Sequence, residues 1–227
     1  MSGIEVGRFG TGVLSRAAAM VYTLLVVELL LLVTTLPGLA ALVLLDRDAS
    51  NVPLAVACAL PLGPALSAAL YTLHHHRADL ADLHPAAAFW RGYRANLGAV
   101  LRIWAPLLAW LAVVAVNLTH LDAAGLPRWW AGPLVAVAAG ASLWGMNALV
   151  IASLFRFGTR DTVRLAAYFL VRARGVALGG LCLLVVAAGV TVLASEAVLA
   201  LAGSLLAWLL LRNHRPMVAE IRQEFTA

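Results

Sequence analysis

One carboxyl group lies deep inside a long apolar stretch of this chain. Glu28 follows Ala17, where that stretch begins, by about 16 Å along an α-helix, which is near the middle of a hydrocarbon layer about 30 Å thick. A charge at that depth costs several kcal/mol, so intramembrane carboxylates face a bundle interior and often mark an ion or proton path. The alternative is a protonated Glu28 that bonds to a neighbouring helix, with Asn147 or Ser67 as partner. Both interpretations stay open.

Two further polar or irregular features lie within apolar stretches. Asn147 shares a helical face with Gly140 and Trp144, and an amide on a small-residue face can bridge two helices or contact a solute. Pro61 and Pro64 each remove a backbone donor, so we predict an interrupted helix there. Broken helices can expose carbonyl groups to a transported solute.

The motifs of common enzyme and metal sites are absent from the sequence. All 16 basic residues are arginine, which excludes both a P-loop and Schiff-base chemistry. Cys58 and Cys182 lie in apolar stretches and lack redox or metal spacing. The consecutive histidines at 74–76 cannot converge on one ion, although Asp79 has helical spacing from two of them. We expect no enzymatic activity, no cofactor and no functional metal.

Composition predicts that this chain resides in lipid. Of its 227 residues, 63% are hydrophobic and 12% are charged, with a mean hydropathy of +0.93, whereas soluble domains carry about 25% charged residues. We predict a single integral membrane domain, all-α, over residues 1–227, with about six transmembrane helices and two amphipathic connecting helices. The predicted spans are 17–45, 52–73, 103–120, 130–154, 176–194 and 197–211.

The arginines predict the orientation. Fourteen of the 16 fall before the first span, in every second connection, or after the last span; Arg47 and Arg128 are the exceptions. Because arginine-rich connections stay in the cytoplasm, both termini are predicted to be cytoplasmic, in a bacterial inner membrane. The net charge of +5 then reflects topology and attraction to membrane lipids, and nucleic acid is not an expected partner.

The two long basic connections predict amphipathic helices. Pro85 suits the first turn of a helix that continues into the third span, and a second helix is predicted with Thr159 as its cap. Such helices either lie on the membrane surface or form a docking surface for a partner. The residues proposed as the interface element of the first helix are Phe89, Trp90, Tyr93, Arg94 and Asn96.

Part of the chain resembles a known family. The segment GPALSAALY at 63–71, a polar connection, and FWRGYRAN at 89–96 before the third span resemble the YesL-like family of bacterial integral membrane proteins. The connection at 74–83 departs from the basic stretch usual in that family. The resemblance implies an accessory role in carbohydrate uptake beside ABC transporter subunits, and it carries no catalytic residue or cofactor.

We therefore expect a non-enzymatic accessory or partner-binding component associated with solute uptake. The second hypothesis is a self-sufficient small transporter or channel that uses Glu28 to bind a cation or proton. The sequence does not determine the oligomeric state.

Overall fold

The computed structural model is an all-helical bundle, which confirms the predicted fold class. It describes residues 13–45, 48–75, 84–125, 127–193 and 196–224, and these contain helices and turns but no strand. Short 3-10 turns at Ala49–Asn51 and Arg128–Trp130 precede two of the helices. The α-helices are α1 (Val13–Leu44), α2 (Val52–Cys58), α3 (Leu62–His74), α4 (Pro85–Thr119), α5 (Ala131–Leu154), α6 (Thr159–Arg172), α7 (Arg174–Leu193), α8 (Glu196–Ala200), α9 (Gly203–Asn213) and α10 (Arg215–Glu224).

Five stretches of the described chain are long and apolar enough to cross a membrane, and they overlap the first five predicted spans. They are Leu14–Leu44, Val52–His74, Pro85–Thr119, Arg128–Leu154 and Arg174–Leu193. The sixth predicted stretch, 197–211, is divided between α8 and α9. Because α9 has 11 residues, it is only about 16 Å long at 1.5 Å per residue. It therefore does not cross a layer about 30 Å thick by itself.

The second stretch is interrupted where the prolines predicted it. α2 ends at Cys58 and α3 begins at Leu62, with Pro61 in the cap position. Backbone carbonyls left over at such a break need donors, because lipid supplies none. The Trp104 indole of α4 donates to the Ala59 carbonyl over 3.0 Å, and the same ring lies against Gly63. That carbonyl also accepts the Leu62 backbone N–H over 3.2 Å, so the indole adds a second donor from the neighbouring helix at the break.

α4 is the longest helix and combines two predicted elements. It runs without interruption for 35 residues from Pro85, the predicted first-turn proline, through the third span. Phe89 is fully buried in the common core, so the first turns of α4 pack onto the bundle. The second amphipathic helix is α6, but Gly158 takes its N-cap position and Thr159 is its first residue. The predicted Thr159 cap was therefore off by one position.

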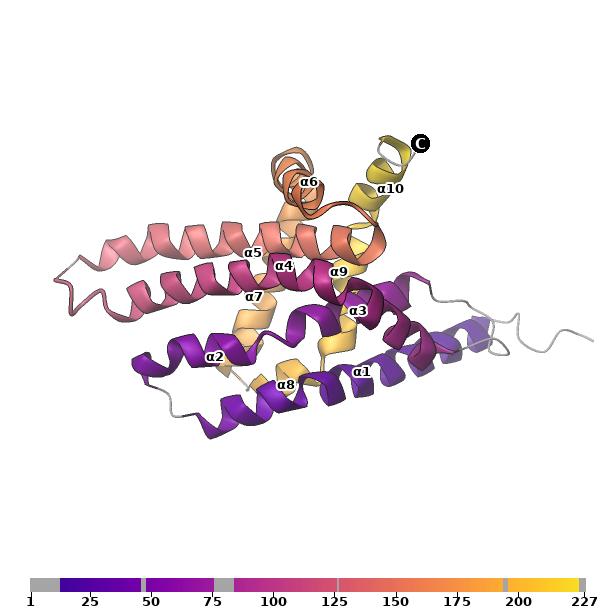
Figure 1. Cartoon of the computed structure of the whole chain (residues 1–227), viewed down its shortest axis with the longest axis horizontal. Helices are drawn as coiled ribbons and strands as arrows, with labels where there is room; N and C mark the ends of the chain where they lie inside the picture. The colour runs from indigo at the N-terminus through magenta and orange to yellow at the C-terminus, as the bar shows by residue number, and fades with distance from the viewer. Residues whose placement is uncertain (1–12, 46–47, 76–83, 126, 194–195, 225–227) are drawn as a thin grey trace, which may run out of the picture.

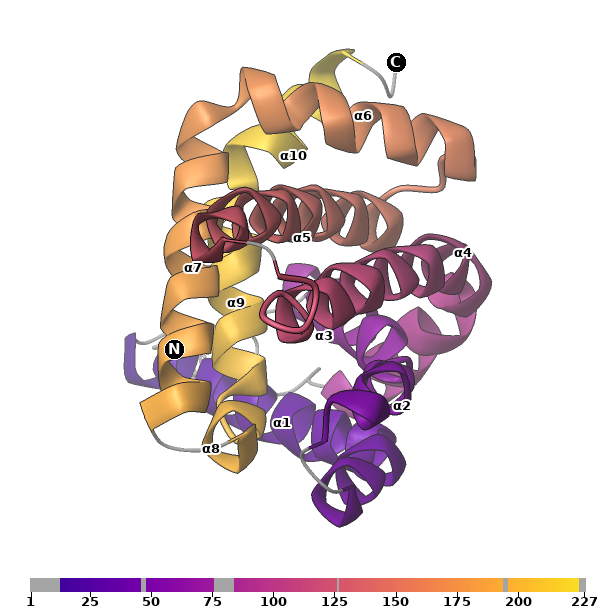
Figure 2. The ribbon, with the colours of Figure 1, turned by 90° about the vertical axis from the view of Figure 1, so that its left-hand side faces the viewer.

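α3 lies at the centre of the bundle and contacts α1, α4, α5 and α9 (Figure 2). Its buried residues are mostly small, including Ala65, Ser67, Ala68 and Ala69, and small residues let helix backbones approach closely. α7 and α9 run side by side and cross the direction of α4 and α5, with α6 and α10 at one end of the pair and α8 at the other (Figures 1 and 2).

α10 was not predicted, because its sequence reads as a basic tail. Met217, Val218 and Ile221 form its buried face. Arg172 of α6 donates to Glu220 over 2.7 Å, and the Arg222 guanidinium lies 3.2 Å from the His74 ring nitrogen. The name basic region is used for the N-terminal half of α4 (85–102) together with the whole of α6 and α10.

Substitution of Gly92 tests how tightly α4 packs on α3. A methyl group on Gly92 would lie 2.8 Å from the Tyr71 ring, whereas one on Gly98 of the same helix would meet nothing within 4 Å. We expect Gly92→Ala to destabilise the protein by about 1–3 kcal/mol through overpacking. Gly98→Ala should be neutral or stabilising, by up to about 1 kcal/mol, because alanine favours helix.

The measurement is thermal unfolding of both purified variants in the same mild detergent, followed by circular dichroism. Equal midpoints for the two variants would contradict the close approach of Tyr71 to Gly92.

Candidate functional site

Polar side chains bond between helices at several places in the described part of the bundle, and three of these contain a residue singled out from the sequence: Asn96, Asn147 or Glu28. The first joins α3, α4 and α5. The Asn96 amide donates to the Ser67 hydroxyl over 3.2 Å and to the Ser153 backbone carbonyl over 3.1 Å, and the two serine hydroxyls are 2.9 Å apart. Ser67 and Ser153 are buried, so this serine–asparagine junction satisfies polar groups that lipid could not.

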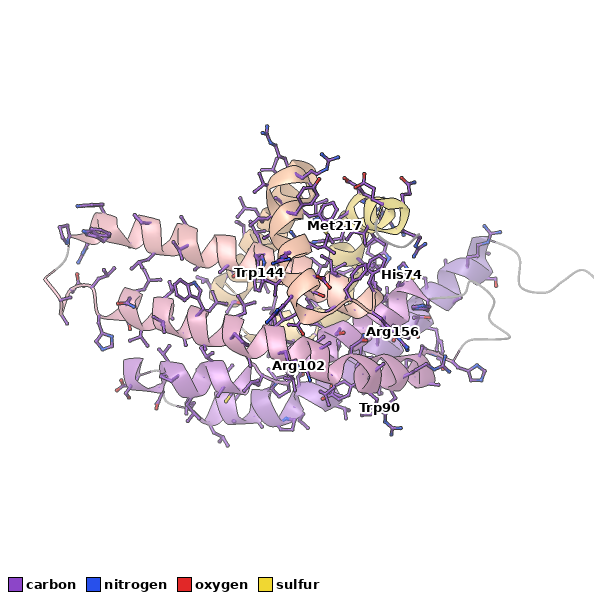
Figure 3. The ribbon with its side chains drawn as sticks, turned by 45° about the horizontal axis from the view of Figure 1, so that its top comes forward. His74, Trp90, Arg102, Trp144, Arg156 and Met217 are labelled. Atoms are coloured by element: carbon purple, nitrogen blue, oxygen red, sulfur yellow. The ribbon has the colours of Figure 1, made fainter. Side chains whose placement is uncertain are left out.

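The five proposed interface residues occupy different positions around α4. Phe89 faces the core and is fully buried, whereas Trp90 is 40% exposed and Arg94 is exposed. Tyr93 lies between them, with its ring centroid 5.7 Å from that of Trp90 and 6.4 Å from that of Phe89. Asn96 points into the bundle at the serine–asparagine junction. Trp90 and Arg94 therefore face outward, and the partly buried Tyr93 packs against the core beside them. Figure 3 shows Trp90 at the edge of the molecule.

The second junction joins α5, α6 and the end of α9. The Asn147 amide donates to the Ala166 carbonyl over 3.2 Å, and its oxygen lies 3.0 Å from Nε2 of His214. Nδ1 of His214 lies 2.8 Å from the Leu210 carbonyl. Both ring nitrogens thus face oxygen atoms. A neutral imidazole carries one N–H and can donate to only one of them.

His214 was not singled out from the sequence. It stands between Asn213 and Arg215 in what reads as a charged tail, and nothing in that pattern indicates burial. In the structure it is 1% exposed and lies beyond the last predicted span. Burial lowers the pKa of His214 to about 4, and its bond to the Leu210 carbonyl opposes that change. The ring is therefore neutral at pH 7.

The third place is Glu28, and neither predicted partner contacts it. Ser67 and Asn147 belong to the two junctions above. One carboxyl oxygen of Glu28 instead accepts the backbone N–H of Ser204 over 2.6 Å. Ser204 lies in the first turn of α9, where backbone N–H groups lack acceptors within the helix. The other oxygen, Oε1, is buried without a partner in the described part of the chain, and it faces Gly203.

The remaining sequence candidates form no site within the described residues. His76 and Asp79 of the histidine cluster lie outside them, and no group of three metal-binding side chains occurs among those described. Cys58 and Cys182 are both free thiols. A groove of about 490 Å³ lies between α2 and α4 and is lined almost entirely by apolar side chains. Asn117 is the one polar side chain among its lining residues.

One family model matches this chain. It is described as "Protein of unknown function, DUF624" and covers residues 20–118. The match runs through most of α1, all of α2 and α3, and almost all of α4, and it ends before α5. It therefore contains Glu28, the interrupted helix and the exposed face of α4. No curated protein and no solved structure matches the chain.

The pKa of His214 predicts how stability depends on pH. The folded state binds the proton less tightly than the unfolded chain, whose histidine has a pKa of 6.5. The unfolded state therefore takes up more protons between pH 6.5 and pH 4, and the free energy of unfolding falls as pH falls through that window. Over this window the pKa shift changes the free energy of unfolding by about 3 kcal/mol.

The measurement is the unfolding midpoint at several values between pH 4 and pH 8, for the wild type and for His214→Gln. Glutamine can donate a hydrogen bond to the Asn147 oxygen but does not titrate, so the loss of stability in acid should be smaller in the variant. Identical pH dependence in both proteins would exclude His214 as its source.

Proposed function

We propose that this protein is a non-enzymatic accessory component of a membrane-bound solute uptake system, and that it binds its partner through Trp90, Tyr93 and Arg94. These three residues are called the docking face. The observation that carries the proposal is that Phe89 is fully buried while Trp90, on the next position of the same turn, is 40% exposed. A large aromatic side chain held outward on a fixed helix is the usual form of a binding hot spot.

Rigidity supports the same proposal. The turn that carries the docking face is held by Phe89 in the core and by Gly92 against the Tyr71 ring. Binding of a partner there costs this helix little conformational entropy, and such preorganisation increases affinity. Tryptophan and arginine are also the residue types most enriched among hot spots.

The proposed orientation places the basic region in the cytoplasm of a bacterial cell. The exposed arginines gather there, and Arg128 and the acidic Asp122 lie at the opposite end of α4 and α5. Membrane proteins keep arginine-rich connections on the cytoplasmic side. The docking face would then meet partners at the inner surface of the cytoplasmic membrane, where the ATPase of an ABC transporter also binds. The exposed arginines of the basic region are Arg91, Arg94, Arg102, Arg160, Arg164, Arg172, Arg215 and Arg222.

The resemblance of residues 63–71 and 89–96 to the YesL-like family gives the partner class. That family is associated with carbohydrate uptake by ABC transporters, so we propose transporter subunits as the partner and carbohydrate as the solute. Both segments lie within the region matched by the family model.

Alanine substitutions test the docking face. We expect Trp90→Ala and Arg94→Ala each to reduce the recovery of ABC transporter permease and ATPase subunits with the tagged protein. Loss of a hot-spot side chain costs about 2 kcal/mol or more, so the binding constant should fall roughly thirtyfold. The measurement is affinity purification in mild detergent with quantitative mass spectrometry of those subunits.

Matched controls come from the same chain. Trp110 is 53% exposed on the far part of α4, and Arg128 has a side chain that is 91% exposed at the opposite end. Trp110→Ala and Arg128→Ala should leave recovery unchanged. Recovery of no transporter subunit with the wild type, or equal losses in all four variants, would overturn the proposal.

A small self-sufficient transporter is the second candidate, because Glu28 has a specific geometry. Its Oε1 atom has no hydrogen-bond partner among the described residues and lies near Gly203, which begins α9 after the gap that follows α8. A second gap, between α2 and α3, also abuts α1, where Gly38 touches the Cys58 carbonyl. Interrupted helices beside an intramembrane carboxylate are a feature of transporters.

Flux through the purified protein tests this candidate. If Glu28 carries a cation or proton, liposomes that contain only this protein should show flux, and Glu28→Gln should reduce it to the background of empty liposomes. Glu220→Gln, which alters a carboxylate of α10 outside the spans, is the control and should retain the flux. The accessory function predicts no flux above background with any of the three proteins.

A further inference from the structure

A groove with polar and apolar walls opens on the basic region, away from the docking face. It has a volume of about 410 Å³ and lies between α4 and the connection from α5 to α6. Asn96, Arg156 and Thr159 supply polar groups to its lining, and Ile103 and Phe155 supply apolar ones. This lining differs from that of the groove between α2 and α4, where apolar side chains dominate.

Two arginines are available to a ligand in this groove. Arg156 lines it directly. Arg102 lies three positions after Ala99 and seven after Ala95 on α4, so it shares a helical face with these two lining residues. Side chains on a helix lean toward its N-terminus, and the Arg102 side chain therefore leans toward those alanines. Both arginines are exposed, and neither forms an ion pair within the described residues. Figure 3 labels both.

The local charge remains positive after the nearest acid is counted. Asp161 lies in the first turn of α6, where its carboxylate approaches Gly158. Arg160, the residue before it, is also exposed. The groove and the segments beside it thus carry three arginines and one aspartate. Guanidinium groups bind phosphate oxygens well because their planar donors match them in pairs.

The depth of the groove favours a lipid as its ligand. Arg102 immediately precedes the predicted span 103–120, and Arg156 follows the predicted span 130–154 by two residues. Arg156 therefore lies where lipid headgroups meet the hydrocarbon layer. Arg102 lies deeper, since its neighbour Ile103 lines a pocket with Gly145 and Ala148 while Asn96 pairs with Ser153, and its side chain reaches back toward the headgroups. The apolar wall continues toward that layer through Ile103, and the rings of Phe155 and Phe157 stack with centroids 5.4 Å apart. A phospholipid has the same order of parts, a phosphate followed by acyl chains.

We propose that this groove binds an anionic phospholipid. The phosphate lies between Arg102 and Arg156 and accepts a hydrogen bond from the Thr159 hydroxyl, while an acyl chain lies along Ile103 and Phe155. The Asn96 side chain closes the inner end of the groove and is held there by Ser67 and Ser153. This site uses none of the exposed docking-face residues, so it does not depend on the function proposed above.

The test uses the purified full-length chain, stripped of lipid in mild detergent. Native mass spectrometry follows binding of short-chain phosphatidylglycerol, with short-chain phosphatidylcholine and inorganic phosphate as comparison probes. We expect saturable binding of phosphatidylglycerol, at least tenfold tighter than phosphatidylcholine, and no competition by inorganic phosphate at equal concentration. Arg102→Gln and Arg156→Gln should each weaken phosphatidylglycerol binding about fivefold, as expected for one arginine near an anionic headgroup.

Two further variants distinguish a specific lipid site from non-specific electrostatic attraction of anionic lipid to the protein. Arg128→Gln removes an exposed arginine from the opposite end of the protein and should leave binding unchanged. Ala99→Phe keeps every charge but fills the groove, and it should weaken binding as well. Circular dichroism of each variant checks that it is folded. Equal binding of the two lipids, displacement by inorganic phosphate, or unchanged binding in both arginine variants would each overturn the proposal.

Discussion

Close packing around α3 is the constraint on which the rest of the structure depends. In lipid, burial of apolar surface does not drive helices together, because the surroundings are as apolar as the side chains. Contact must instead come from backbones that approach closely. The small side chains Ala65, Ser67, Ala68 and Ala69 allow α1, α4, α5 and α9 to reach α3. A larger residue at these positions would separate α3 from a neighbouring helix.

The same apolar setting explains where the polar side chains lie. Each break in a helix leaves backbone groups that need partners from elsewhere. Trp104 supplies a donor at the break between α2 and α3, and Glu28 supplies an acceptor at the start of α9. A carboxylate there also meets the positive end of the α9 dipole. Glu28 therefore links α1 to the first turn of α9.

The amphipathic helices combine a buried face with an exposed, charged one. In α4, Phe89 anchors the helix while Trp90 and Arg94 stay exposed. In α10, Ile221 is buried while Glu220 pairs with Arg172 of α6. Charged side chains thereby occupy defined positions on helices whose other face is buried in the core. The exposed arginines have defined positions relative to one another only because these helices pack onto the core.

The sequence alone determined the features that depend on local composition: the all-helical class, five of the membrane-length stretches, the break at Pro61 and the start of α4 at Pro85. Each follows from hydropathy, a missing backbone donor or a fixed φ angle, which act over a few residues. Tertiary structure decided the contacts between distant segments. It joined Asn96 to Ser153, gave Glu28 the Ser204 amide as partner and buried His214, because these pairings depend on how helices far apart in the chain cross.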